Sequence, residues 1–211
     1  MIAREDRAEG LRIIRLDRAE KRNAMNGAMV QALLDALAEA GADAAVRAIV
    51  LAGKGPGFSA GADLAEMQAL AGEARAARSA LTVALMEAPP LVPKPVIAAV
   101  QGAAMGAGAS LALACDGLVM AEDARLAWPE AKHAMLPRLV APVLLRHLGP
   151  KPAFDLLATG RSVSAAEALA LHLATRIVPE AELLDTACDL ARAAALLPPG
   201  AMAELKRMVH R

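Results

Sequence analysis

Three short runs of uninterrupted small and apolar residues constrain the fold of this chain more than any other feature. They are AIVLAG at 48–53, PVIAAV at 95–100 and GLVMA at 117–121. A strand with one face in water alternates apolar and polar residues, whereas a strand covered on both faces is apolar throughout. Segments with helical spacing lie before and between the runs, as in MVQALLDALAEA at 29–40, ahead of the first run. The alternation of the two patterns predicts an α/β fold with buried sheets.

Weaker patterns predict the remaining elements. We expect strands at 11–17, 125–128 and 175–179 and a helix over 64–88 that is interrupted by Gly72 and ended by Pro89-Pro90. Ser164, with a glutamate three residues later, has the form of a helix N-cap. The chain turns mainly helical after residue 138. We therefore expect a single domain over 1–211, with a core at 1–137 and a helical C-terminal region at 138–211.

Composition and charge exclude several classes of protein. Hydrophobic residues make up 56% of the 211 residues, enough to bury a large core. The 23 basic residues balance 23 acidic ones, which argues against a nucleic-acid binder. Cys115 and Cys188 lie in apolar helical contexts and are expected to be buried and reduced. The charged first ten residues predict no signal peptide, and no apolar run reaches the roughly 20 residues that cross a bilayer, so we expect a cytoplasmic protein without membrane contact.

Two glycine-rich loops each follow an apolar run and precede a helix. The first is GKGPGFSAGADL at 53–64, and the second begins MGAGASL at 105. Helix N-termini leave amide N–H groups unpaired, and residues without bulky side chains let a ligand approach these amides. Either loop alone is equally well explained as a tight turn. The two together favour a site where main-chain amides stabilise a developing oxyanion, such as that of an ester or thioester carbonyl.

Several shorter motifs allow other interpretations. GFSAG at 57–61 matches the serine nucleophile elbow, with Ser59 as nucleophile and His133, His147 or His172 as base. GAGASL at 106–111 resembles the start of a dinucleotide-binding fingerprint, although a leucine replaces its third glycine. Glu130 in WPE is either an ordinary first-turn acid or a general acid/base. No His/Cys cluster has metal-ligand spacing.

Considered jointly, the motifs make the chain resemble the crotonase, or enoyl-CoA hydratase/isomerase, superfamily. The matching segments occur in the family's order over nearly the whole length: EKRNAMN at 20–26, FSAGADL at 58–64, KPVIAAVQGAAMGAGASLALACD at 94–116, WPE at 128–130 and TGRSVSAAEALALHLATRIVPE at 159–180. The resemblance implies a crotonase-like spiral of ββα units with a shortened helical C-terminal part. It also implies assembly as a homotrimer or a dimer of trimers.

The resemblance further implies an acyl-CoA substrate, with coenzyme A present only as part of the thioester and no permanently bound cofactor or metal. The N–H groups of Ala62 and Ala107 would polarise the thioester carbonyl, and Glu130 would be the acid/base. Residues expected along the CoA are Arg22, Ala24, Ala60, Asp63 and Leu64.

The chain departs from the family pattern at the second catalytic glutamate, which falls at Ser110. A hydroxyl can hold a water or a substrate oxygen but is no carboxylate base. Ser110 is therefore a candidate site residue in a different role. A single glutamate favours double-bond isomerisation over hydration, which stays open. The alternatives are a non-catalytic acyl-CoA-binding protein and a serine hydrolase that uses Ser59.

Overall fold

The larger of two sheets forms the centre of the molecule. The computed structural model describes residues 1–210, and in it five parallel strands follow one antiparallel edge strand. In sheet order the strands are β1 (Ile2–Arg7), β2 (Leu11–Leu16), β3 (Ala48–Gly53), β4 (Val96–Val100), β6 (Gly117–Ala121) and β9 (Arg176–Val178). Every residue of β3, β4 and β6 is buried, as their uninterrupted apolar sequences predicted.

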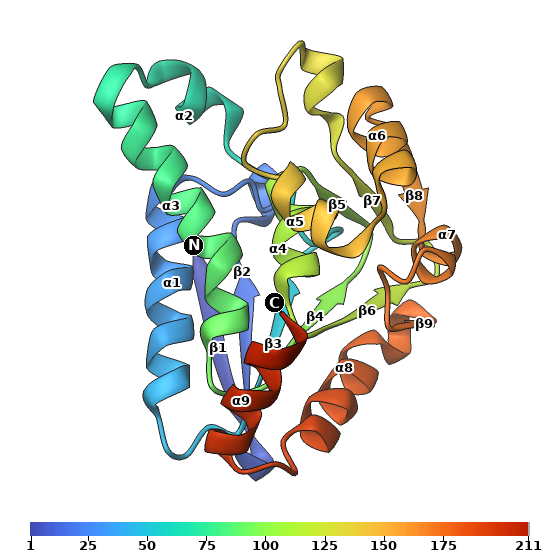
Figure 1. Cartoon of the computed structure of the whole chain (residues 1–211). Helices are drawn as coiled ribbons and strands as arrows, with labels where there is room; N and C mark the ends of the chain where they lie inside the picture. Colours follow the sequence, from blue (N-terminus) through green and yellow to red (C-terminus); the bar gives the residue numbers. More distant parts are fainter. Residues whose placement is uncertain (211) are drawn as a thin grey trace.

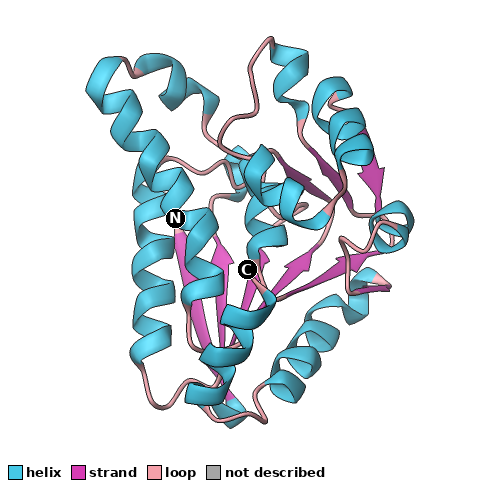
Figure 2. Ribbon diagram, in the orientation of Figure 1, coloured by secondary structure: helices cyan, strands magenta, loops and turns pink. Residues whose placement is uncertain are grey.

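A smaller sheet lies beside the larger one (Figure 2). It contains β5 (Ala103–Met105), β7 (Arg125–Ala127) and β8 (Ser162–Ser164), with β5 parallel and β8 antiparallel to β7. Both β8 and β9 come from the region after residue 138, so the C-terminal part of the chain completes both sheets.

Helices cover both faces of the larger sheet. Figure 1 shows α1 and α3 on one side of the sheet and α8 on the other. The α-helices are α1 (Gly27–Ala42), α2 (Leu64–Ala69), α3 (Gly72–Leu91), α4 (Ala107–Ala114), α5 (Ala141–His147), α6 (Pro150–Thr159), α7 (Ala165–Ala170), α8 (Glu180–Ala194) and α9 (Pro199–Val209). Short 3₁₀ helices are η1 (Ala8–Gly10), η2 (Ala19–Lys21) and η3 (Pro129–His133). Within residues 1–210, none of the helices has the length and apolar character needed to cross a bilayer.

Most predicted elements are confirmed to within a few residues. The strands expected at 11–17, 48–53, 95–100, 117–121, 125–128 and 175–179 are β2, β3, β4, β6, β7 and β9. The Ser164 hydroxyl accepts a hydrogen bond from the amide of Glu167 at 3.2 Å, which confirms the N-cap of α7. Cys115 and Cys188 are buried and free, as expected.

Several features differ from the prediction, and the three-residue strands β5 and β8 were not predicted. The strand β1 was missed because its sequence, IAREDR, is mostly charged; it is a half-exposed edge strand, where charges prevent further pairing. The predicted end of a helix at Pro89-Pro90 is wrong, because α3 continues through both prolines to Leu91. Prolines in the last turn remove only main-chain bonds near the helix end, and buried Pro89 packs within the fold.

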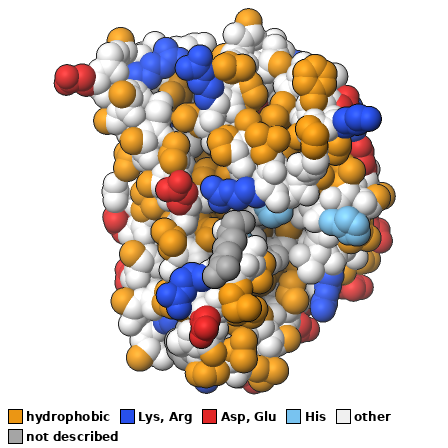
Figure 3. Space-filling model, in the orientation of Figure 1, with side chains coloured by type: hydrophobic (Ala, Val, Ile, Leu, Met, Phe, Trp, Pro, Cys, Tyr) orange, Lys and Arg blue, Asp and Glu red, His pale blue; other side chains and the backbone are white. Residues whose placement is uncertain are grey.

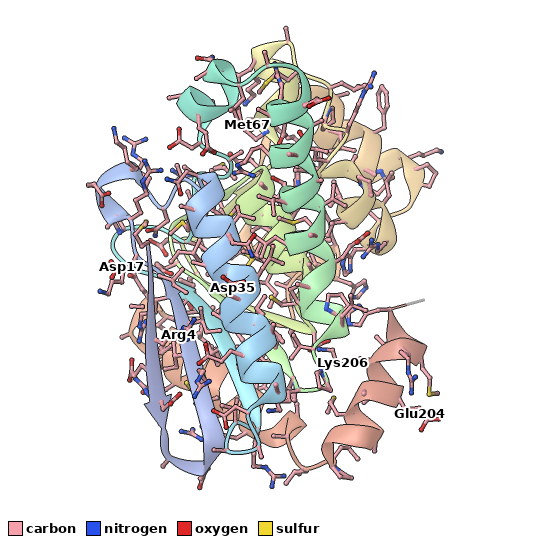
Figure 4. The ribbon with its side chains drawn as sticks, turned by 90° about the vertical axis from the view of Figure 1, so that its left-hand side faces the viewer. Arg4, Asp17, Asp35, Met67, Glu204 and Lys206 are labelled. Atoms are coloured by element: carbon pink, nitrogen blue, oxygen red, sulfur yellow. The ribbon has the colours of Figure 1, made fainter. Side chains whose placement is uncertain are left out.

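A buried lysine attaches α9 to the rest of the molecule. The Lys206 ammonium donates to the carbonyls of Pro89 at 2.7 Å and Lys94 at 2.9 Å, and it pairs with Asp116 at 2.7 Å. The side chain lies between α9 and the end of α3 (Figure 4). The carbonyl of Pro89 belongs to the last turn of α3, where a cation is favourable.

We expect Lys206→Met to reduce the free energy of unfolding by about 1–3 kcal/mol, because it leaves the buried carbonyls of Pro89 and Lys94 without their donor. Urea denaturation followed by circular dichroism measures this. Arg207→Met, on the same helix but exposed, is the matched control and should stay within about 0.5 kcal/mol. Equal effects of the two substitutions would contradict the anchoring role of Lys206.

Candidate active site

The two glycine-rich loops lie side by side in parallel register. Ser59 forms a parallel bridge with Ala104, in which its amide donates to the Ala103 carbonyl at 3.1 Å and its carbonyl accepts from the Met105 amide at 2.9 Å. Further along the two loops, a Cβ on Gly61 would lie 3.4 Å from the Ala107 amide nitrogen, so the residue before Ala62 adjoins Ala107.

Glycines permit this close approach. A Cβ on Gly61, which has φ +91°, would lie 2.6 Å from the Met105 carbonyl oxygen, and a Cβ on Gly108 would lie 2.8 Å from the Ser59 carbonyl oxygen. The small residues of the loops are therefore needed to pack the loops against each other. Alanine is tolerated at 107 because it is the first residue of α4; the positive φ belongs to Gly106.

Two main-chain amides are left free by this arrangement. The Gly61 carbonyl accepts from the Met25 amide, and the Asp63 amide donates to the Met25 carbonyl. Because successive main-chain groups of an extended segment point to opposite sides, the amide of Ala62 points away from Met25. Ala107 opens α4 and has no acceptor within the helix. Among residues 1–210 neither amide has a hydrogen-bond acceptor, and both residues line the same pocket.

The pocket has a volume of about 660 Å³ and lies between α2 and α3 on one side and the segment from η3 to α5 on the other. Both α2 and the segment that follows η3 lie at the top of the view in Figure 1. The residues that line it are Ala60, Gly61, Ala62, Leu64, Met67, Arg75, Ser79, Thr82, Met105, Gly106, Ala107, Pro129, Glu130, His133, Met135, Leu136, Pro137, Arg138, Leu139 and Val140.

Glu130 is the only carboxyl group among these lining residues. It lies in the first turn of η3, where Pro129 starts the helix after the fully buried Trp128. Its Oε2 atom is buried and has no hydrogen-bond partner in the described chain. Burial raises the pKa of Glu130, and the nearby His133 lowers it to a smaller extent. A carboxyl with a raised pKa and a free oxygen is suited to proton transfer near neutral pH.

Glu130 also lies against the second loop. A Cβ on Gly106 would come within 2.7 Å of Glu130 Oε1, and the backbone of Gly106 has φ +49°. The carboxyl group therefore adjoins the residue that precedes the Ala107 amide. The pocket combines two free amide donors with one partly buried carboxyl group.

Ser110 lies in the core and not on the pocket wall. Its side chain is 0% exposed, and its hydroxyl accepts from Trp128 Nε1 at 3.0 Å and donates to the Val140 carbonyl at 3.3 Å. The hydroxyl thus connects α4 to the segment that carries Glu130 and to the pocket residue Val140. Its two bonds go to protein atoms, whereas we expected it to hold a water or substrate.

The hypothesis of a serine nucleophile at Ser59 does not fit the structure. Ser59 is 1% exposed, and its hydroxyl donates to the Asn23 carbonyl at 2.8 Å and accepts from the Gly61 amide at 3.1 Å. Both partners are main-chain groups, so the proton of the hydroxyl points to a carbonyl and not to a histidine. The serine stabilises the loop that presents Ala62.

The residues expected along the CoA divide into two groups. Ala60 and Leu64 line the pocket, whereas Arg22, Ala24 and Asp63 do not. The Arg22 carbonyl accepts from the Ala60 amide at 2.9 Å, and the Ala24 carbonyl accepts from Arg18 at 2.9 Å.

Asp63 has a structural task. It caps α2 by accepting from the amides of Ala65 and Glu66, and it pairs with Arg18 at 2.6 Å. The Arg18 bond and the two amides lower the pKa of Asp63. The pair therefore holds the first loop in place beside the pocket.

Sequence reasoning missed several lining residues, above all the cations Arg75 and Arg138. Arg75, Ser79 and Thr82 follow one another at helical spacing along α3, and this is the signal that could have grouped them on one face. No comparable pattern indicated Arg138. Among the described residues no group of histidine, cysteine or carboxylate side chains could hold a metal ion.

Comparison with known proteins identifies the family. The family model for enoyl-CoA hydratase/isomerase matches residues 6–211. A Thermus thermophilus protein named "Putative enoyl-CoA hydratase" is 42% identical over 200 residues, which cover 93% of this chain and 79% of that protein. The chain belongs to the enoyl-CoA hydratase/isomerase family, within the crotonase superfamily.

Solved structures of family members have the same fold. A Mycobacterium smegmatis enoyl-CoA hydratase superposes with a TM-score of 0.94 at 34% identity, over 100% of this chain and 82% of that one. A Polaromonas enoyl-CoA hydratase gives a TM-score of 0.93 at 32% identity, over 99% and 82%. The predicted crotonase-like α/β fold is confirmed.

We expect Ser110→Ala to lower the free energy of unfolding by about 1–3 kcal/mol, because it leaves the buried indole N–H of Trp128 without its acceptor. Denaturant titration measures the loss. Ser162→Ala at an exposed position in β8 is the control and should change stability by less than about 0.5 kcal/mol. A Ser110→Ala protein as stable as the parent would contradict the bridging role.

We expect Glu130→Gln to be more stable than the parent at pH 8, with the gain fading toward pH 4.5. Below the unfolded-state pKa of 4.5 the carboxyl is neutral in both states. As the pH rises through the raised folded-state pKa, the buried group must ionise and stability falls, whereas glutamine carries no such cost. Thermal unfolding from pH 4.5 to 8 tests this, with exposed Glu122→Gln as control. A pH-independent difference would contradict the assigned burial cost.

Proposed function

We propose that the protein catalyses proton transfer on an acyl-CoA thioester, with an enolate stabilised by the amides of Ala62 and Ala107 and with Glu130 as the acid/base. The observation that carries the proposal is the meeting of two free amides and one unpartnered carboxyl oxygen in a single pocket. Membership of a family described as enoyl-CoA hydratase/isomerase supports the thioester as substrate.

In the proposed reaction the Glu130 carboxylate removes a proton from the carbon next to the thioester of a 3-enoyl group. The electron pair of the broken C–H bond moves into the thioester carbonyl, whose oxygen becomes negative. The amides of Ala62 and Ala107 donate hydrogen bonds to that oxygen, and one such donor is typically worth about 2.7–4 kcal/mol. Glu130 then returns the proton at the far end of the allylic system, which shifts the double bond to the 2-position.

The number of carboxyl groups that line the pocket favours isomerisation over hydration. A hydratase of the two-carboxylate kind holds a water between both acids, whereas this pocket is lined by Glu130 alone. The hydroxyl of Ser110 is bonded to Trp128 and Val140, so holding a water would cost those bonds. A single group that removes and returns one proton needs no second acid.

The remaining parts of the proposal concern binding and assembly. The CoA portion would extend along Ala60 and Leu64, which line the pocket, toward the turn of Arg22 and Ala24 and past Asp63. The active form would be a homotrimer or a dimer of trimers. Exposed apolar side chains support an assembly of this kind, and Phe154 on α6 is 74% exposed. Figure 3 shows hydrophobic side chains on the surface of one face of the molecule.

A non-catalytic acyl-CoA-binding role is the second candidate, and the observation that favours it is the core location of Ser110 at the position of a family catalytic glutamate. Such a protein would bind thioesters without exchanging their protons. Proton exchange therefore separates the two functions.

We expect Glu130→Gln to slow isomerisation of a 3-enoyl-CoA in deuterated water by about 10²–10⁴-fold, because it removes the proton carrier. Mass spectrometry of the acyl group and absorbance of the 2-enoyl thioester measure exchange and turnover. Thioester affinity should change little, and Glu122→Gln should retain full activity. Unchanged turnover in Glu130→Gln would refute the role of the residue, and a parent protein that binds but never exchanges would favour the non-catalytic function.

A further inference from the structure

The pocket holds more positive charge than the proposed reaction uses. Arg75 and Arg138 both line it, and within residues 1–210 neither guanidinium makes an ion pair or a hydrogen bond. Arg78, one turn further along α3, shows the contrast: it bonds Glu66 at 2.8 Å, Thr82 at 2.7 Å and the Met25 carbonyl at 2.6 Å. The fold satisfies one arginine of this helix and leaves its neighbour in the pocket without a partner.

Both arginines lie at the open end of their walls. On the α3 wall, Thr82 is only 4% exposed, whereas Arg75 is exposed. The two residues are seven positions apart, which is about 10 Å along the helix axis. On the facing wall Val140 is buried and Arg138 is exposed. Basic side chains gather at the upper edge of the face in Figure 3, between α2 and η3. Each wall therefore runs from a buried inner end to a cation at the mouth.

Large apolar side chains also line the pocket, namely those of Met67, Met135, Leu136 and Leu139. Such a surface suits a short aliphatic chain. A chain that ended in a methyl group would reach two unpaired guanidiniums, whereas one that ended in an anion would match them in charge.

We propose that Arg75 and Arg138 bind a carboxylate at the far end of the acyl group, so that the substrate class is CoA thioesters of dicarboxylic acids. The inference rests on the proposed function. Arginine pairs with carboxylates through two parallel N–H bonds, which gives direction as well as charge. The guanidiniums would thereby fix the length of chain that places its reacting carbons at Glu130.

The phosphates of CoA offer the same anionic oxygens, and the position of Glu130 favours the acyl carboxylate over them. Glu130 must reach carbons of the acyl group, so the acyl chain extends on the Glu130 side of the two amides. The segment that follows Glu130 in the chain supplies Met135, Leu136, Arg138 and Leu139 to the wall. The CoA would leave on the side of Ala60.

Binding of two saturated thioesters of equal chain length tests the proposal without turnover. Adipoyl-CoA ends in a carboxylate and hexanoyl-CoA in a methyl group, and calorimetry gives both dissociation constants. We expect the parent protein to prefer adipoyl-CoA by about 10-fold or more. Arg75→Met and Arg138→Met should each weaken adipoyl-CoA binding about 5- to 10-fold and leave hexanoyl-CoA binding unchanged, and the double variant should show no preference.

Arg146→Met, an exposed arginine outside the pocket lining, is the matched control and should keep the preference. Thermal unfolding of each variant confirms that it is folded. Equal losses for both thioesters would assign the arginines to CoA phosphates, and a parent protein without preference would overturn the carboxylate site; in both results the proposed function stands. A parent protein that binds neither thioester would overturn the proposed function itself.

Discussion

The parallel pairing of the two glycine-rich loops is the contact on which the rest of the site depends. The bridge between Ser59 and Ala104 sets their register, and Gly61 and Gly108 let the backbones approach to distances that a Cβ would prevent. Because each loop follows a strand of the buried sheet, the sheet fixes where the pair lies. The amide of Ala62 is free because Gly61 and Asp63 bond to Met25 on the other side, and that of Ala107 is free because the residue starts α4.

The same packing explains why a carboxyl group can be kept in an unfavourable place. Trp128 is fully buried and bonded to Ser110, so the backbone before Glu130 cannot move toward solvent without breaking a core contact. The cost is a buried oxygen without a partner and a raised pKa. A buried polar group without a partner lowers the stability of the fold, and such groups are common at sites that transfer protons at neutral pH.

The walls of the pocket separate two kinds of recognition. In the proposed function the main-chain amides would recognise a carbonyl whatever acid it belongs to, which agrees with a fold shared across a family. Side chains nearer the mouth come from α3 and from the segment after η3, and these can differ among members without disturbing the loops. Arg75 and Arg138 belong to this second kind, and they are where we place the choice of acyl group.

The sequence by itself determined which segments are strands and helices, because apolar runs and helical spacing are local; it also singled out Ala62, Ala107 and Glu130, through motifs, as residues of one site. It did not show the charged edge strand β1, whose partner is β2, nor that α3 passes through Pro89 and Pro90. Only the tertiary structure decided that the hydroxyls of Ser59 and Ser110 are used within the core and that Arg75 and Arg138 share a pocket. These outcomes depend on contacts between residues far apart in the chain, and local patterns carry no information about which distant groups will meet.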